Sequence, residues 1–502
     1  MINIQLKNEL DRQQGIIIND KSKYICVSAC PGAGKTYTLV SKITKELNEL
    51  KDFQGVIACS FTKESSKEIR QRLNDNDKLD NSYIGTIDSF IMKLIIFPYL
   101  NRYLFSKNLI NERIEIKRIK IDNDKNLNRY VRYYDSSEYT KKEANLYAKK
   151  WLNDLIEGTY SISFPAYILA ANIIKMDIFN QYFSSRYPTI YIDEAQDMNI
   201  FQHLVLNTLK EYTNINIVLL GDPNQSIYQF RGAKPSLFRN LFNKGYTCRE
   251  ITVSVRCHPS ILYYANKIFN KNLEKNFRES HVQIINDFNL EFLNTLEGNV
   301  FILVENNKTA IDIYEYLKDD YDIYFSKGLD EMPDDYIENK DVIDELIKYY
   351  INYDNENDRY KYPIDDLLQY LKNYVKSINK KHFKLQNRTF VDFIIDVSSI
   401  IGVDICKKTV EKIDEKLTDE KYKYYYYISD KANKIMTIHS SKGLESNDVI
   451  IVLETPYSVY NEEFRNKLFV AITRAKKNVY IYMQDNFSGK QYIESLLKDN
   501  NM

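Results

Sequence analysis

The sequence is poor in the residues that build metal centres and disulfide scaffolds. Its 502 residues include six cysteines and five histidines. The cysteines form no C-x-x-C pair and the histidines do not cluster, so neither a zinc or iron–sulfur site nor a disulfide framework is expected. The N-terminus is too polar for a signal peptide, and no apolar run is long enough to span a bilayer. We therefore expect a cytoplasmic protein.

An excess of charge of one sign is also lacking. Lys+Arg and Asp+Glu number 69 each, so net charge neither favours nor excludes a nucleic-acid ligand. Residues 331–366 hold 12 acidic residues against 4 basic ones. Together with residues 367–424 they form a mostly helical region in this interpretation. Its acidic part suits a protein partner or a simple solvated surface, and the sequence does not decide between them.

A basic, tyrosine-rich stretch covers residues 101–150. It holds 13 Lys/Arg against 7 Asp/Glu, a balance that fits a nucleic-acid contact surface. Within it, residues 113–120 alternate in the manner of a half-buried strand. The interleaved tyrosines are Tyr103, Tyr130, Tyr133, Tyr134, Tyr139 and Tyr147.

What the chain does contain is a phosphate-binding loop. A strand-like run from Tyr24 leads into a small-residue loop, and a helix follows. Backbone N–H groups and the helix N-terminus can cradle a triphosphate there, with Lys35 on the β- and γ-phosphates and Thr36 on Mg²⁺. An ordinary strand–turn–helix connection is the alternative, but the spacing favours a nucleotide site. The loop residues are Ala29, Cys30, Pro31, Gly32, Ala33, Gly34, Lys35 and Thr36.

An acidic pair supplies what such a loop requires. The apolar run 189–192 is followed directly by Asp193 and Glu194. Asp193 is expected to hold Mg²⁺, and Glu194 to polarise the attacking water. A simple turn is the other interpretation of an Asp-Glu pair. After a phosphate loop, catalysis is the better one.

Strand-like and helix-like segments alternate along both halves of the chain, which predicts parallel α/β sheets. Strands are expected at 56–62, 189–192 and 216–220, and later at 448–454 and 478–483. Residues 83–90 have the form of a strand leading into a helix, and residues 435–439 start the second α/β unit. Ligands of such sheets bind at the carboxyl ends of the strands. The hydroxyls of Thr62, Thr86 and Ser89 lie at such ends and suit phosphate-backbone contacts, although helix capping explains each of them taken singly.

The motifs occur as one ordered series. They are Gln14, Ala29–Thr36, Ser60–Thr62, Gly85–Thr86, Asp193–Asp197, Gly221–Ala233, Val255–Cys257, Thr437–Glu445 and Val470–Ala475. In this order they resemble the UvrD/Rep/PcrA group of superfamily 1 helicases. The resemblance covers the two motor lobes well and the insertions hardly at all.

This resemblance implies an α/β fold of two RecA-like P-loop lobes with mostly helical insertions, and ATP and Mg²⁺ as cofactors. Lobe 1A would comprise residues 1–95 and 156–250, interrupted by insertion 1B at 96–155. Lobe 2A would comprise residues 251–330 and 425–502, interrupted by a reduced insertion 2B at 331–424.

The resemblance also implies residue roles. Gln14, Tyr37, Gly443 and Glu445 would join the phosphate loop in binding the nucleotide. Gln225 would sense the γ-phosphate, and two arginine fingers, Arg256 and Arg474, would reach it from the second lobe. The track for single-stranded DNA would comprise Phe61, Thr62, Thr86, Phe230, Thr437 and His439.

Four positions depart from the family pattern. Val255 stands where a base-stacking tyrosine is usual, Phe230 where tryptophan is common, Asp88 where histidine is usual, and Ser446 where an aromatic commonly follows Glu445. Phenylalanine still offers a π-face to a base. Asp88 would be a poorer neighbour for a phosphate than histidine. The second insertion is also short, so ATP hydrolysis and translocation are expected more firmly than efficient unwinding by the isolated chain.

The leading hypothesis is an ATP-dependent helicase or translocase moving 3′ to 5′ on single-stranded DNA or a 3′-tailed duplex. It would act in repair or replication. In scale the chain is also similar to the helicase-like subunit of the Gabija antiphage system, which works with an OLD-type nuclease partner. The alternative is a nucleotide-gated DNA-binding or regulatory subunit with little unwinding of its own.

Overall fold

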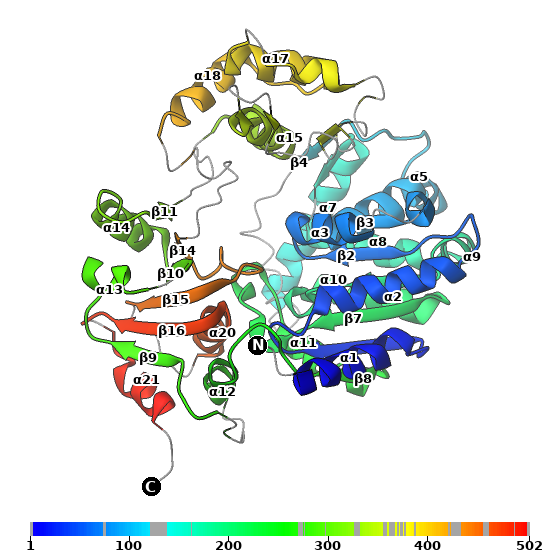
Figure 1. Ribbon diagram of the computed structural model, residues 1–502. Helices are drawn as coiled ribbons and strands as arrows, with labels where there is room; N and C mark the ends of the chain where they lie inside the picture. The colour runs from blue at the N-terminus through cyan, green and yellow to red at the C-terminus, as the bar shows by residue number, and fades with distance from the viewer. Residues whose placement is uncertain are drawn as a thin grey trace. The chain divides into compact units, whose positions relative to one another are not determined.

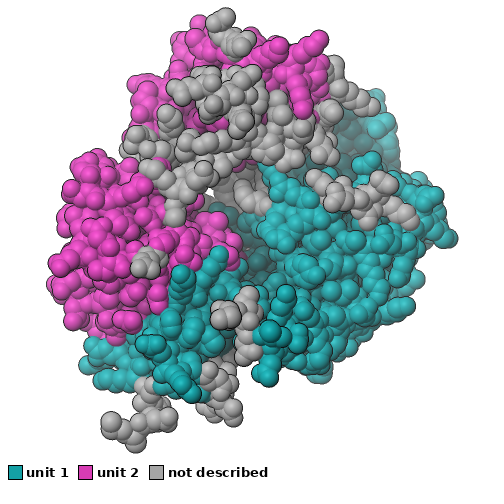
Figure 2. Space-filling view, in the orientation of Figure 1, with its two compact units in different colours: residues 1–282, 457–477, 491–502 teal, residues 283–456, 478–490 magenta. Residues whose placement is uncertain are grey.

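The computed structural model describes residues 4–73, 77–120, 138–161, 163–269, 275, 277–296, 298–325, 332–354, 359–360, 367–368, 371, 375, 378–385, 388–419, 422, 433–454, 461–485 and 487–498. The chain divides into two compact units (Figures 1 and 2). The first comprises residues 1–282, 457–477 and 491–502, and the second comprises residues 283–456 and 478–490. Each unit contributes one parallel α/β arrangement, as the sequence predicts.

The first unit is built on a six-stranded sheet of order β3-β2-β6-β7-β1-β8. Every neighbouring pair is parallel. Since a parallel strand needs a crossover connection, helices cover both faces. The inner strands β2, β6 and β7 are almost fully buried, whereas the edge strand β8 contains Arg249 and Glu250 and alternates in exposure. The strands are β1 (Tyr24–Ala29), β2 (Ile57–Ser60), β3 (Tyr83–Thr86), β6 (Thr189–Ile192), β7 (Asn216–Gly221) and β8 (Thr247–Ile251).

The helices of this unit fall into two layers. One face of the sheet carries α1 (Ile4–Asn19), α2 (Lys35–Glu49) and α3 (Lys63–Leu73). Their apolar stripes enclose a core with alternate residues of the strands, such as Ile25 and Val27 of β1. Cys26 points to the opposite face and its larger core, as the two-residue period of a strand requires.

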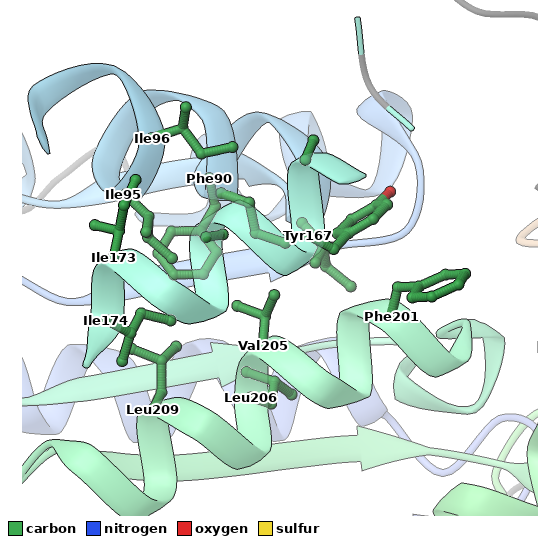
Figure 3. Packing of buried hydrophobic residues seen from close by; sticks show 14 of the residues in the cluster. Phe90, Ile95, Ile96, Tyr167, Ile173, Ile174, Phe201, Val205, Leu206 and Leu209 are labelled. Atoms are coloured by element: carbon green, nitrogen blue, oxygen red, sulfur yellow. The ribbon is translucent and has the colours of Figure 1, made fainter. Parts of the chain in front are cut away.

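The larger core is closed mainly by α8 (Phe164–Ile174) and α10 (Ile200–Tyr212), which pack against one another (Figure 3). They meet α4 (Ile87–Phe90) and the π-helix Ile91–Ile96. The rings of Tyr167 and Phe201 stack at 6.0 Å between centroids, with 12° between planes. Further helices are α5 (Phe97–Ser106), α7 (Glu138–Ile156), α9 (Asp177–Arg186), α11 (Pro235–Arg239), α12 (Pro259–Lys267), α20 (Glu462–Ile472) and α21 (Lys490–Leu497).

The second unit contains another six-stranded sheet, of order β11-β14-β10-β15-β16-β9. Its core packs against α13 (Leu290–Asn294) and α14 (Asn307–Leu317). The edge strand β9 and its neighbour β16 begin with residues that belong to the first unit. The strands are β9 (Val282–Ile285), β10 (Val300–Val304), β11 (Tyr324–Phe325), β14 (Lys434–Thr437), β15 (Ser446–Leu453) and β16 (Ala475–Met483).

Residues 332–422 of the second unit enclose an apolar core of their own. Its helices are α15 (Asp334–Ile351), α17 (Phe390–Ile401) and α18 (Lys407–Lys416), joined by a 3₁₀ turn at Lys380–Phe383. A two-stranded antiparallel pair, β12 (Tyr353–Asp354) and β13 (Arg359–Tyr360), lies between α15 and this turn in the sequence. The mainly helical character predicted for this region is therefore present in its described part.

The strand predicted at 113–120 is much shorter in the structure. Only Arg118–Lys120 forms a strand, β4, which pairs in parallel with β5 (Thr159–Ser161). Residues 113–117 form no strand: the side-chain amide of Asn101 bonds the N–H and C=O of Ile114, and Lys117 N bonds Gly158 O at 2.8 Å. Tyr130, Tyr133 and Tyr134 lie outside the described residues, and so does most of the basic stretch that contains them.

Candidate active site

The phosphate loop lies between β1 and α2 and depends on two glycines. Gly32 and Gly34 have φ of +72° and +69°, a region that L side chains rarely adopt. Space is short as well: a Cβ on Gly32 would lie 2.3 Å from the Cβ of Arg256. A backbone bond from Cys30 N to Ile251 O, 2.9 Å long, ties the loop to the end of β8. The loop is thus held open for an anion at the N-terminus of α2.

The magnesium side of the site follows from strand register. Cys59 of β2 pairs with Ile192 of β6, and the N–H of Asp193 bonds the carbonyl of Cys59 at 2.8 Å. This brings Asp193 to the phosphate loop, where the Thr36 hydroxyl donates to its Oδ2 at 3.2 Å. An oxygen-only pair of hydroxyl and carboxylate suits Mg²⁺, so the residues fit the ion that the sequence implies.

Asp193 is strongly buried, with 2% of its surface exposed. Burial raises its pKa to about 6, and the nearby charge of Glu194 adds to the rise, while Lys35 opposes it. A buried carboxylate with a raised pKa lacks sufficient positive charge around it. A bound divalent cation would supply that charge and favour the ionised carboxylate.

Glu194 occupies an unusual backbone position. Its φ of 54° and ψ of 37° place a residue other than glycine in the left-handed region. Its carboxylate accepts a hydrogen bond from the amide of Gln196, which is fully buried. The Gln196 side-chain oxygen accepts from the N–H of Asp222 at 3.0 Å. Gln196 therefore orients the candidate base and joins it to the loop after β7, a role that the sequence did not reveal.

The loop after β7 carries the predicted γ-phosphate sensor. Asp222 orients Gln225 by accepting from its Nε2 at 2.7 Å. The guanidinium of Arg474 reaches the same glutamine: its Nη2 lies 3.4 Å from Gln225 Oε1. Arg474 is 1% exposed, and its Nε donates to Val470 O at 3.0 Å. Asn466 Nδ2 donates to Ser226 O at 2.8 Å, which ties α20 to this loop.

Both predicted arginine fingers lie in the first unit. Arg256 lies beside the phosphate loop, as the close approach of its Cβ to Gly32 shows. The segment is held there because Val255 N bonds Gly32 O at 3.3 Å and Arg256 N bonds Ser254 Oγ at 3.2 Å. Lys35, Asp193, Gln225, Arg256 and Arg474 thus belong to one compact unit.

Gln14, Tyr37 and Val255 are the residues expected near the adenine base. Gln14 is 4% exposed, and its Nε2 donates to Ala33 O at 2.9 Å, so this donor is engaged with the phosphate loop. Tyr37 and Val255 are 55% and 38% exposed. Gln14 and Tyr37 both border Gly34: a Cβ there would lie 2.7 Å from Gln14 Nε2 and 3.7 Å from Tyr37 Cβ.

Comparison with known proteins agrees with this geometry. A family model described as an AAA domain matches residues 13–231, and one described as a UvrD-like helicase C-terminal domain matches residues 434–482. Gabija protein GajB of Bacillus cereus (strain VD045) is 30% identical, and the alignment covers 98% of each chain. The chain belongs to the GajB family of UvrD-like helicases. The family resemblance inferred from the motifs is thereby confirmed.

More distant relatives of this GajB-family chain are helicases of the UvrD/Rep type. A probable DNA helicase II homolog of Mycoplasma capricolum is 27% identical over 60% of this chain and 45% of that protein. The ATP-dependent DNA helicase Rep of Buchnera aphidicola is 28% identical over 49% of this chain and 42% of that protein. The GajB-family chain thus spans less than half the length of these two helicases.

The predicted strand track of the GajB-family chain contains an aromatic and cationic cluster in the first unit. Phe61, at the end of β2, stacks on Tyr228 with 4.9 Å between centroids and 27° between planes. Tyr228 also meets Phe230, which is 48% exposed. The Arg231 guanidinium lies over both of these rings, at 5.4 and 5.5 Å from their centroids. Tyr228 and Arg231 were not among the predicted contacts, although they stand in the quoted motif.

The two predicted threonine contacts serve as helix caps. Ser65 N donates to Thr62 Oγ1 at 3.2 Å, and Ser89 N donates to Thr86 Oγ1 at 3.3 Å. The capping explanation that the sequence left open therefore holds for both hydroxyls. A hydroxyl that accepts from the backbone still carries its own proton, so DNA contact by Thr62 and Thr86 stays a prediction.

The remaining predicted residues of the GajB-family chain belong to the second unit. Thr437 ends β14, and its Oγ1 bonds Ser440 Oγ at 2.9 Å. Gly443 has φ of +87°, two residues before Glu445. The contacts predicted for Thr437, His439, Gly443 and Glu445 with DNA or nucleotide stay predictions.

The sequence predicts neither a metal cluster nor a membrane-spanning segment, and the described part of the chain can be compared with both expectations. There, no group of three or more His, Cys, Asp or Glu side chains is placed to hold a metal ion. Among the helices that the structure describes, none is long and apolar enough to cross a membrane.

Proposed function

We propose that this protein is an ATP-dependent DNA helicase or translocase that moves 3′ to 5′ on single-stranded DNA. The observation that carries the proposal is the assembly of one hydrolytic set within the first unit. The Thr36 hydroxyl meets Asp193, Gln196 orients Glu194, and Arg474 reaches Gln225. A protein that only bound nucleotide would have no need of an oriented base or of a buried arginine.

Each residue has a distinct task in this proposal. The loop N–H groups and Lys35 bind and orient the triphosphate, and Glu194 accepts the proton of the attacking water. Arg474 and Arg256 stabilise the negative charge that develops on the transferring phosphoryl group. Mg²⁺, when bound by Thr36 and Asp193, would neutralise charge on the phosphate oxygens.

The strand would lie along the aromatic and cationic cluster of Phe61, Tyr228, Phe230 and Arg231. The exposed ring of Phe230 suits base stacking without sequence preference, and Arg231 adds positive charge beside it. Tyr228 and Phe230 follow Gln225 in the same loop, three and five residues later. A change in the conformation of Gln225 would therefore need to pass through only a few residues to reach the rings. Closure of the two lobes on ATP would complete each step.

The first test is ATP hydrolysis with and without a thymidine oligonucleotide. We expect strong stimulation by the oligonucleotide. Glu194→Gln should reduce turnover by about 10²-fold or more while ATP still binds, because it removes the base and keeps the shape. Lys35→Ala is the matched control, since it should weaken binding itself. Absence of stimulation in the wild type would instead favour a nucleotide-gated regulatory subunit.

The direction and the biological role need separate tests. Duplexes with a 3′ or a 5′ single-stranded tail distinguish the polarities, and unwinding of only the 5′-tailed duplex would refute the 3′-to-5′ assignment. The GajB relationship supports a role in antiphage defence with a nuclease partner of the OLD type. Co-purification with the product of a neighbouring nuclease gene tests this role. A helicase that acts alone in repair would co-purify with no such nuclease.

A further inference from the structure

The short helix α4 is fixed to two other helices by a single carboxylate. Oδ1 of Asp88 accepts from the Tyr167 hydroxyl of α8 at 2.9 Å and from Nε2 of Gln202 of α10 at 2.7 Å. Figure 3 shows Tyr167 where α8 faces α10. Asp88 is only partly exposed, and burial raises its pKa. A carboxylate that is committed to two neighbouring helices is placed for packing and not for a phosphate.

Gln202 extends the connection toward the catalytic segment. Its Oε1 accepts from the N–H of Asn199 at 3.0 Å, and Asn199 Oδ1 in turn caps α10 by accepting from Gln202 N at 2.9 Å. Asn199 also forms an antiparallel bridge with Ala233. This bridge attaches the end of the loop that carries Phe230 to Asn199. Asn199 lies five residues after Glu194, so the same residue joins the catalytic segment to the strand-side loop.

At its other end the connection reaches the predicted strand track. Thr86 caps α4, and Asp88 is the second residue of that helix. α4 continues without a break into the π-helix Ile91–Ile96 and α5, and its residues Ile87 and Phe90 are buried in the larger core. Within this helix, the carboxylate of Asp88 hydrogen-bonds side chains of both α8 and α10. Thr86 itself ends β3, where it pairs with Ser60 of β2, so Asp88 joins this strand end to α8 and α10.

We propose that Asp88 is a positioning residue that couples occupancy of the strand-side loops to ATP turnover. It joins the helix that Thr86 caps, through Gln202 and Asn199, to the Phe230 loop and the catalytic segment. The inference rests on the proposed function, because coupling has a readout only if DNA stimulates hydrolysis. It also gives a positive reason for an oxygen acceptor at this position, since one oxygen accepts from a hydroxyl and an amide at once.

The test measures ATP turnover against the concentration of a thymidine oligonucleotide, together with thermal unfolding. Asp88→Ala removes the acceptor and should raise the oligonucleotide concentration for half-maximal stimulation about tenfold, while turnover without DNA changes less than twofold. Asp88→Asn retains an oxygen acceptor of the same size and should restore most of the affinity. Asp177→Ala is the matched control, since Asp177 also lies in the first turn of a helix but is exposed.

A merely structural role would give a different pattern. It would lower turnover with and without DNA by the same factor, in proportion to the loss of thermal stability, and this result would overturn the proposal. The proposal would also be overturned if the Asp88→Ala protein were stable and needed the same oligonucleotide concentration for half-maximal stimulation as the wild type. These failures are distinct from failure of the proposed function, in which the wild-type protein itself shows no response to the oligonucleotide.

Discussion

The guanidinium of Arg474 lies 3.4 Å from the side-chain oxygen of Gln225, across 249 residues of sequence. Arg474 is nearly fully buried, and Gln225 is 4% exposed. The proposed arginine finger and the proposed γ-phosphate sensor therefore contact each other directly in this structure. A phosphate oxygen that accepts from Arg474 would compete with Gln225 for the same donor, so ATP binding should change the orientation of the sensor.

Arg474→Lys should be nearly as damaging as Arg474→Ala. Lysine keeps the charge, but it has no planar fork to contact Val470 O and Gln225 together. We expect turnover to fall about 10³-fold in both variants, with ATP affinity changed much less. Steady-state hydrolysis and equilibrium binding of a fluorescent ATP analogue measure the two quantities. Near-normal turnover in the lysine variant would show that charge alone suffices.

Gln196→Glu should weaken catalysis through its neighbour. The substitution replaces the amide that donates to Glu194 with a second carboxylate, and like charges raise the pKa of both groups. Turnover should fall about 10²-fold at neutral pH and recover partly as the pH rises. The measurement is a pH profile of kcat beside that of the wild type. Two profiles of the same shape would assign Gln196 a purely structural role.

Gly32→Ala should distort the phosphate loop. A Cβ there meets Arg256 Cβ at 2.3 Å, and alanine disfavours a φ of +72°. We expect ATP affinity to fall about tenfold or more and Tm to decrease. The control is Gly15→Ala in α1, where no atom lies within 4 Å of the added Cβ. That change should stabilise the protein by about 0.5–1 kcal/mol and leave ATP affinity unchanged.

Stability should depend on pH through Asp193. Its folded pKa is about 6, above the ordinary value of 3.8. The folded protein therefore binds this proton more tightly than the unfolded chain. The resulting stability is fully present below pH 4 and is lost as the pH rises through 6. Asp193→Asn carries no such charge, so at pH 7.5 and without Mg²⁺ it should be the more stable protein, by on the order of 3 kcal/mol at most.

Thermal unfolding of both proteins between pH 5 and pH 7.5 checks this expectation. The difference between wild type and Asp193→Asn should shrink toward pH 5. Added Mg²⁺ and ATP should stabilise the wild type more at pH 7.5 than at pH 5, because the proton competes with the metal. A difference that does not vary with pH would contradict the assignment. The same comparison in a Glu194→Gln background removes the neighbouring negative charge and so separates its effect on the pKa of Asp193.

Much of the fold could be predicted because periodicity and motif spacing are local signals. The strands predicted at 189–192 and 216–220 occur at Thr189–Ile192 and Asn216–Gly221. The strand predicted at 113–120 was largely wrong. There the alternation is real, but the backbone of Ile114 is bonded by the amide of Asn101 in place of a neighbouring strand.

The contacts that connect motifs could not be predicted from the sequence. Gln196 orients Glu194 only because the register of β6 and β7 brings Asp222 to its other end. Asp88 departs from the family pattern, and the sequence could only mark it as a poor phosphate neighbour. Its partners Tyr167 and Gln202 lie 79 and 114 residues away. Such roles depend on side chains that meet only after the sheet has formed.

Residues 457–477 belong to the first compact unit although they follow most of the second one in sequence. This order has a consequence during translation. Arg474 is made 249 residues after Gln225, which at about 5–20 residues per second is a delay of roughly 10–50 s. Over that interval a nascent chain has its phosphate loop but lacks the arginine that we expect to drive hydrolysis. Newly made copies should therefore consume no ATP while they are still on the ribosome.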